Sequence, residues 1–118
     1  MTSAKKKEQK LDRVFAALAD SSRRQMLVQL RKRPLTISEL AGQYSISFAG
    51  VAKHVHVLEE AGLVHKVRDS EDGRRTRLQL ANQTLNEATA WLEYHQKFWT
   101  DKLNQLEAYI MQDGADHE

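Results

Sequence analysis

The residues best suited to chemistry are small and basic side chains between positions 47 and 56. Ala49, Lys53 and His56 are spaced four and three residues apart, which places them on one face of a helix. That face carries no acidic residue before Glu60. The major groove of DNA favours such a surface, because bulk and negative charge are both penalised there. The candidate DNA contacts in this segment are Ser47, Phe48, Ala49, Lys53 and His56.

The sequence also indicates how this helix is held in place. Val51, Val55 and Leu58 fall on the opposite face, where an apolar stripe packs against a core. Ser47 can cap the start of the helix, and Gly62 can end it. The pattern predicts one buried face and one exposed face.

Two aromatic side chains of this segment allow more specific expectations. His54 lies at the edge of the apolar face, so we expect a packed, hydrogen-bonded histidine rather than a base contact. Phe48 has two open interpretations. Its ring either contacts a thymine methyl group or packs on the preceding helix.

A β-hairpin is predicted directly after this helix. Residues 63–68 and 75–80 are short runs rich in β-branched and apolar residues, and the loop between them contains Asp-Gly, a strong hairpin signal. Alternation in the second run places Arg75, Arg77 and Gln79 on its outer side. Arginine suits phosphate or minor-groove contacts. The candidates are Arg68, Arg74, Arg75 and Arg77, and we expect the acidic tip, Asp69, Glu71 and Asp72, to stay in water.

Three helices are predicted before the helix at 47–60. The first runs from Leu11 to about Ala19, and the second is capped by Asp20 or Ser21 and stopped by Pro34. Thr36 and Glu39 have capping-box spacing, which predicts a third helix over residues 37–44. The expected fold class is mainly α with a small β-hairpin, a winged helix-turn-helix of order α-α-α-α-β-β-α.

A long final helix is predicted over about residues 83–112, without Gly or Pro. Its apolar stripe exceeds what a small domain can cover, so a second copy of the chain is the expected cover. The alternative is that this helix folds back onto its own core. The residues expected at the dimer interface, from the first and last helices, are Leu11, Phe15, Leu92, His95, Trp99, Leu103, Leu106 and Ile110.

Composition limits the possible classes. The chain has 118 residues, 41% of them hydrophobic, and no cysteine, which fits one domain in a reducing cytoplasm. No segment is long and apolar enough for a membrane span, and the first ten residues lack a signal-peptide core. Residues 1–33 hold ten Lys or Arg against three Asp or Glu, whereas residues 81–118 hold two against seven. We expect a basic flexible tail at 1–10, the winged domain at 11–112 and an acidic tail at 113–118.

Enzymatic chemistry finds little support. The five histidines form no combination of nucleophile, base and orienting group, and no glycine-rich phosphate loop is present. Glu93 and His95 are a weak candidate pair for a metal, and the acidic tail with His117 is a loose cluster. We expect no enzyme, no cofactor and no metal site.

Four segments carry a family resemblance: residues 18–24 (LADSSRR), 38–41 (SELA), 53–64 (KHVHVLEEAGLV) and 73–75 (GRR). Over about residues 11–112 the chain resembles the ArsR (ArsR/SmtB) family of winged-helix transcriptional repressors. The resemblance implies a homodimer joined through its first and last helices. It also implies that the helix at 47–60 reads a twofold-symmetric operator near the protein's own promoter and thereby blocks transcription.

The chain departs from the metal-sensing members of that family. Many of them release DNA when a metal binds to cysteines, or to a carboxylate-x-His pair in the last helix that residues of the partner complete. Cysteine is absent, and Leu106 and Tyr109 occupy the positions of the second half of the Glu93/His95 site. Ala52 replaces a DNA-contacting serine of many relatives. The resemblance is therefore to members with an aromatic-rich last helix and no recognised metal site.

The expected function is that of a homodimeric, sequence-specific repressor of its own or an adjacent operon. Its expected partners are double-stranded DNA with an inverted-repeat operator and a second copy of the chain. Its regulator is either a small organic effector or only its own abundance. Two alternatives stay open, a winged-helix protein-interaction module and a metal-responsive repressor with an atypical His/carboxylate site.

Overall fold

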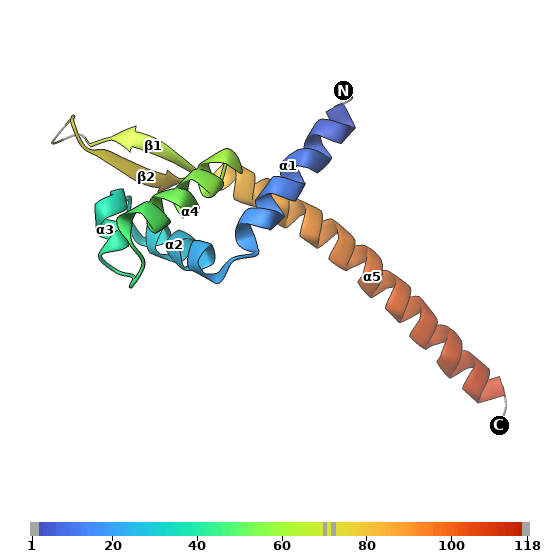
Figure 1. Cartoon of the computed structure of the whole chain (residues 1–118). Coiled ribbons are helices and arrows are strands. Elements are labelled where there is room, and N and C mark those ends of the chain that lie inside the picture. Colours follow the sequence, from blue (N-terminus) through green and yellow to red (C-terminus); the bar gives the residue numbers. More distant parts are fainter. Residues whose placement is uncertain (1–2, 70, 72, 117–118) are drawn as a thin grey trace. The chain divides into compact units, whose positions relative to one another are not determined.

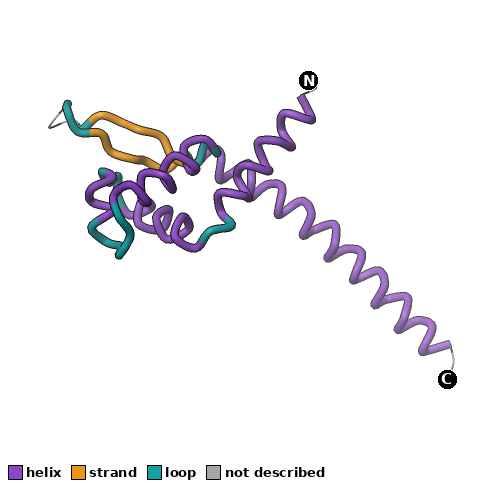
Figure 2. The backbone as a smooth tube through the Cα atoms, viewed as in Figure 1, coloured by secondary structure: helices purple, strands orange, loops and turns teal. Residues whose placement is uncertain are grey.

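The computed structural model describes residues 3–69, 71 and 73–116, and Figures 1 and 2 show its backbone. The elements are α1 (Ser3–Leu18), α2 (Ser21–Lys32), α3 (Ile37–Ala41), α4 (Phe48–Glu60), β1 (Val64–Arg68), β2 (Thr76–Leu80) and α5 (Asn82–Asp116). This order confirms the predicted winged helix-turn-helix. The chain divides into two compact units, one up to Leu85 and one from Asn86 onward.

Three element boundaries differ from the sequence-based expectation by three residues or more. Helix α1 begins at Ser3, so residues 3–10 are helical where we expected a flexible tail. Lys, Ala, Glu and Gln dominate that stretch, and all four are good helix formers. Helix α5 likewise continues to Asp116, through residues 113–116 of the expected acidic tail, whose last two residues lie outside the described part. Helix α3 ends at Ala41 rather than Tyr44, because Gln43 and Tyr44 follow in tighter turns, in which their N–H groups donate to the Leu40 and Ala41 carbonyls.

The core of the first unit lies between α1, α2, α4 and the hairpin. Val51, Val55 and Leu58 of α4 are buried, as their spacing predicted. They share the core with Val14 of α1 and Met26 of α2. Burial of this one face leaves the opposite face of α4 in solvent.

Side-chain caps fix where the helices begin. The carboxylate of Asp20 accepts the Arg23 backbone N–H at 3.1 Å, which caps α2. The predicted capping box of α3 is complete, since the Glu39 N–H donates to Thr36 Oγ1 and the Thr36 N–H donates to Glu39 Oε1. The hydroxyl of Ser47 accepts the Gly50 N–H at 3.1 Å and caps α4, as predicted.

The wing is an antiparallel hairpin in which Val64 pairs with Leu80 and Arg68 with Thr76. Leu35, between α2 and α3, forms a further bridge to Leu78 of β2 through backbone bonds of 3.2 and 2.7 Å. Strand β2 is therefore bonded on both edges, to β1 and to the chain that leads into α3.

Helix α4 ends in a Schellman motif. The Gly62 N–H donates to the Glu59 carbonyl and the Leu63 N–H to the Leu58 carbonyl, both at 2.9 Å. Gly62 has φ +76°, a left-handed conformation that costs residues with a Cβ atom free energy. This turn sets the direction in which the chain leaves α4 for the wing.

Replacing Gly62 with Ala is expected to lower the free energy of unfolding by about 1–2 kcal/mol. A Cβ atom at this position also lies only 3.2 Å from Thr84 Oγ1. Urea denaturation measures the change, and Gly73→Ala is the matched control because a Cβ there meets nothing within 4 Å. Equal stability of the Gly62 variant and the wild type would contradict this interpretation of the turn.

Candidate nucleic-acid interface

The exposed face of α4 carries the residues that the sequence singled out. Ala49, Lys53 and His56 are all exposed, and Phe48 at the start of the helix is 56% exposed. Gly50 lies beneath this face, where a Cβ atom would come within 2.6 Å of Ile46 Cγ2. The absence of a side chain at Gly50 therefore lets the turn before α4 pack closely, and the small side chain of Ala49 leaves that part of the outer face open.

His54 has the hydrogen-bonded role that its position predicted. Its Nδ1 accepts a hydrogen bond from Arg23 Nη1 at 3.2 Å, since arginine can only donate. Arg23 also donates from Nε to the Ala17 carbonyl at 2.7 Å and from Nη2 to the Ala16 carbonyl at 3.1 Å. One guanidinium thus links α1, α2 and α4.

A hollow of about 250 Å³ lies between the start of α3, the start of α4 and the wing. Phe48 lines it together with Ile37 of α3, so the ring borders the preceding helix while most of its surface remains in solvent. The polar residues of the lining are Thr36, Ser38, Arg75 and Thr76. Hydroxyl and guanidinium donors around an open hollow are the groups that contact DNA phosphates.

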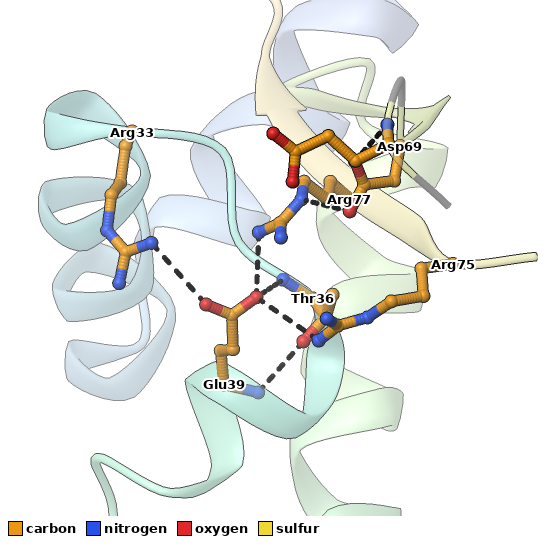
Figure 3. Close-up of polar contacts among 7 residues, drawn as sticks. Arg33, Thr36, Glu39, Asp69, Arg75 and Arg77 are labelled. Atoms are coloured by element: carbon orange, nitrogen blue, oxygen red, sulfur yellow. Dashed lines mark hydrogen bonds and ion pairs between the residues drawn. The ribbon is translucent and has the colours of Figure 1, made fainter. Parts of the chain in front are cut away.

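The carboxylate of Glu39 forms ion pairs with three arginines beside this hollow (Figure 3). Glu39 Oε1 accepts a hydrogen bond from Arg77 Nη1 at 2.8 Å and lies 3.9 Å from Arg75 Nη2. Glu39 Oε2 lies 3.5 Å from Arg33 Nη1. The backbone bond from Thr36 is the largest cause that lowers the pKa of Glu39, and Arg77 and Arg33 lower it further against the opposing effect of burial.

The wing arginines do not share one environment. Arg77 also donates from Nε to Asp69 Oδ2 at 3.0 Å, and this bond is the main cause that raises the pKa of Arg77. The side chain of Asp69 is only 10% exposed, so the expectation that it stays in water is wrong. Arg68, Arg74 and Arg75 are exposed residues, whereas Arg77 is partly buried. Strand alternation placed Arg75 and Arg77 on the same outer side of the wing. In the structure Arg77 is partly buried and bonded to Glu39 and Asp69, whereas Arg75 is exposed.

The stability of the wing is expected to depend on pH through Glu39. Because its folded pKa is lowered, the stability it adds is fully present above the ordinary glutamate pKa of about 4.3 and is lost as the pH falls through the folded value. Glu39→Gln keeps the capping-box hydrogen bonds but removes the charge. The variant should unfold more easily than the wild type at about pH 7, and the difference should shrink at about pH 3. Urea denaturation at both pH values measures it, and a difference that does not change with pH would contradict the assignment.

Comparison with known proteins identifies the family. A model described as "Helix-turn-helix domain" matches residues 18–67. The chain is 34% identical over 105 residues to the HTH-type transcriptional regulator Rv2034 of Mycobacterium tuberculosis, covering 89% of this chain and 92% of that protein. An ArsR-like transcriptional regulator from Rhodococcus sp. RHA1 superposes with a TM-score of 0.73 at 31% identity, covering 84% of this chain and 91% of that one. This chain belongs to the ArsR family. It is a helix-turn-helix transcriptional regulator rather than an enzyme.

A further relative comes from Bacillus subtilis. The uncharacterized HTH-type transcriptional regulator YuzN of Bacillus subtilis is 39% identical over 90 residues, which is 70% of this chain and 95% of that protein. Membership of the family implies DNA binding by this ArsR-family chain. Which residues contact the DNA stays a prediction.

His56 of this regulator lies toward α1 rather than toward the wing. It lines a second hollow, of about 200 Å³, with Arg13 and Ala16 of α1 and with Val57 and Glu60 of α4. The distance from Ala49 to His56 along the helix is about 10 Å at 1.5 Å per residue. His56 thus lies at the far end of the exposed face, on the side away from Phe48.

Helix α5 exposes the aromatic stripe that the sequence predicted. Trp99 is 63% exposed and Leu106 55% exposed, while the His95 ring lies 4.3 Å from the Trp91 ring and 5.1 Å from the Tyr94 ring, between centroids. The other large exposed hydrophobic side chains from Trp91 onward are Trp91, Leu92, Tyr94, Phe98, Leu103, Tyr109, Ile110 and Met111. A surface of this size and composition on one helix is typical of an interaction site.

No metal site and no membrane span are found in the described residues. Among the described side chains, those of residues 3–69, 71 and 73–112, no three His, Asp or Glu lie close enough together to hold a metal ion. None of the helices in this part of the chain combines the length and the apolar composition that crossing a bilayer requires.

Sequence reasoning did not single out three positions of the candidate site. Ser38 and Thr76 line the hollow at the wing, and Arg33 contacts Glu39. The capping-box signal marked Glu39 only as a helix start. Its pairing with Arg77, 38 positions later, requires the fold.

Proposed function

We propose that this ArsR-family chain binds an inverted-repeat operator as a homodimer and represses transcription of its own or an adjacent operon. The observation that carries the proposal is the exposed face of α4, small and basic, beside an arginine-bearing wing. Such a helix fits the major groove, and a wing beside it contacts the neighbouring backbone.

Specific roles follow for the residues of α4. Lys53 contacts a phosphate or a base edge, and Ala49 allows the helix to approach the bases closely. Phe48 contacts a thymine methyl group. The hydroxyl of Ser47 accepts the Gly50 N–H and keeps its own proton to donate to a phosphate. His56 contacts DNA at the far end of the face.

The wing supplies backbone contacts in this proposal. Arg75 is half exposed and borders the hollow with Ser38 and Thr76, where one phosphate oxygen can be bound by several donors. Arg68 and Arg74 contact neighbouring phosphates along the same strand. Phosphate contacts of this kind set the register of α4 and make binding depend on salt.

Dimerisation through α5 and α1 supports a twofold-symmetric site. Burying large, exposed apolar side chains against a second copy favours association. A second copy is the natural occupant, because an identical stripe is self-complementary about a twofold axis. Leu11 and Phe15 of α1, both half-buried within one chain, are further residues that we assign to the interface. Two α4 helices related by this axis read half-sites about one helical turn apart.

Regulation in this proposal needs no metal. The ring of His95 lies among the rings of Trp91 and Tyr94, a packed position that suits an interface better than an open coordination site. A small organic effector at the aromatic stripe, or abundance alone, then controls DNA binding. The metal-responsive alternative predicts zinc binding that His95→Ala abolishes, measured by calorimetry.

Footprinting of the region upstream of the gene tests the proposal. We expect protection of an inverted repeat at about 50 mM salt that weakens at about 200 mM. A duplex with the repeat scrambled is the control. Absence of protection at low salt, with the dimer present, would contradict the proposal.

The exposed aromatic stripe also supports a second candidate function, a protein-interaction module. This candidate predicts negligible affinity for any duplex DNA and a stable complex with a different protein. Sedimentation of the pure chain separates the two, because a module waiting for another protein stays monomeric while the proposed repressor dimerises.

A further inference from the structure

Arg77 is bonded to carboxylates from two different parts of the fold. Its Nη1 donates to Glu39 Oε1 of α3 at 2.8 Å, and its Nε donates to Asp69 Oδ2, just after β1, at 3.0 Å. Both distances are close to those of charge-assisted hydrogen bonds. The side chains of Arg77, Glu39 and Asp69 are only 25%, 26% and 10% exposed.

The other two arginines at Glu39 are held more loosely. Arg33 lies 3.5 Å from the carboxylate and is 65% exposed, and Arg75 lies 3.9 Å away and is 50% exposed. Exposed ion pairs at such distances contribute little to stability, so a phosphate can replace Glu39 as the partner of Arg75 at small cost. Removing Arg77 instead takes the cation away from the largely covered carboxylate of Asp69, which is costly.

Backbone bonds reinforce the position of Arg77. Its neighbour Leu78 exchanges two hydrogen bonds with Leu35, the residue that precedes the capping box of α3. Two consecutive residues of β2 therefore fasten the wing to the α3 side of the domain, one through its side chain and one through its backbone. Asp69 closes the wing loop as well, because its N–H donates to the Arg75 carbonyl at 2.9 Å.

We propose that Arg77 is a positioning residue that does not contact DNA. Through Glu39 and Asp69 (Figure 3) it holds the wing against α3. Arg75 thereby stays beside the hollow that Ser38 and Phe48 also line. Arg77 thereby fixes the spacing between the wing and α4 before DNA binds. The role of Arg75 as a DNA contact rests on the proposed function. The attachment of the wing to α3 through Arg77 is a property of the protein without DNA.

Three variants test it: Arg77→Gln, Arg77→Lys and the matched control Arg75→Gln. Two quantities are measured for each. One is the affinity for a random-sequence DNA duplex of about 30 base pairs over a salt series. The other is hydrogen exchange of the Leu35 and Leu78 amides in the DNA-free protein, which are bonded to each other's carbonyls.

For Arg75→Gln we expect the negative slope of log affinity against log salt to become shallower by about one, with unchanged hydrogen exchange at Leu35 and Leu78. For Arg77→Gln we expect about threefold to tenfold weaker binding with an unchanged slope, and exchange at Leu35 and Leu78 at least about tenfold faster. Arg77→Lys should resemble Arg77→Gln in exchange, because a lysine cannot form the fork that bonds both carboxylates.

A slope that falls by about one in Arg77→Gln, with exchange unchanged, would show that Arg77 contacts phosphate and would overturn the proposal. Unchanged binding and unchanged exchange would overturn it as well. A wild type that binds no duplex would refute the proposed function. Hydrogen exchange at Leu35 and Leu78 in the Arg77 variants would then still show whether Arg77 attaches the wing to α3.

Discussion

Replacing Lys53 and Arg75 with alanine together is expected to weaken operator binding about a hundredfold at about 0.1 M salt. Each cation supplies a contact of roughly 1–2 kcal/mol, one in α4 and one in the wing. The slope of log affinity against log salt should also fall by about two if both contact phosphates. Fluorescence anisotropy with a labelled operator duplex measures both quantities.

The fold should tolerate this double substitution. Both residues are exposed, and the loose pair of Arg75 with Glu39 adds little stability. Arg31→Ala combined with Lys97→Ala is the matched control, since it removes two cations outside α4 and the wing. Loss of cooperative unfolding in the Lys53/Arg75 variant, or equal loss of binding in the control, would show that specific contacts are not the cause.

Introducing glutamate at Trp99 and Leu106 of α5 is expected to produce a monomer. Both side chains are more than half exposed in the single chain, so the substitutions leave its own fold intact while placing charges in the proposed interface. Operator affinity should fall by at least about a hundredfold, because one α4 helix then binds without the second. Sedimentation velocity and anisotropy measure the two effects.

The polar side of the same helix offers a matched control. Thr100→Glu and Asn104→Glu add the same charge to exposed positions of α5 outside the stripe. They should leave both assembly and binding unchanged. A Trp99/Leu106 variant that stays dimeric would place the interface elsewhere and contradict the role of the stripe.

Much of the fold was predictable because its signals are local. Asp20, the Thr36/Glu39 capping box and Ser47 each act within three residues, and Gly62 marks a left-handed turn that most side chains disfavour. The apolar spacing of α4 correctly separated its buried and exposed faces. Helix lengths were less predictable, since α1 extends over a charged stretch whose residues favour helix without packing on a core.

The candidate site was only partly predictable, because its pairing is non-local. Strand alternation gave Arg75 and Arg77 the same expected face but could not reveal that Glu39 and Asp69 would pair with one of them tightly. The sequence likewise showed Asp69 only as an acidic residue of the hairpin loop. Its side chain is in fact largely covered and bonded to Arg77. Residues close in space but 38 positions apart in the chain leave no short-range pattern.

The most direct test of the account is a titration of the footprinted duplex with the wild-type chain over a salt series, combined with sedimentation of the complex. The account predicts two chains per duplex and an affinity that falls at least about tenfold between about 50 and 200 mM salt. It also predicts binding to the operator at least about a thousandfold tighter than to a scrambled duplex. Equal affinity for the two duplexes, or no binding at low salt, would contradict it.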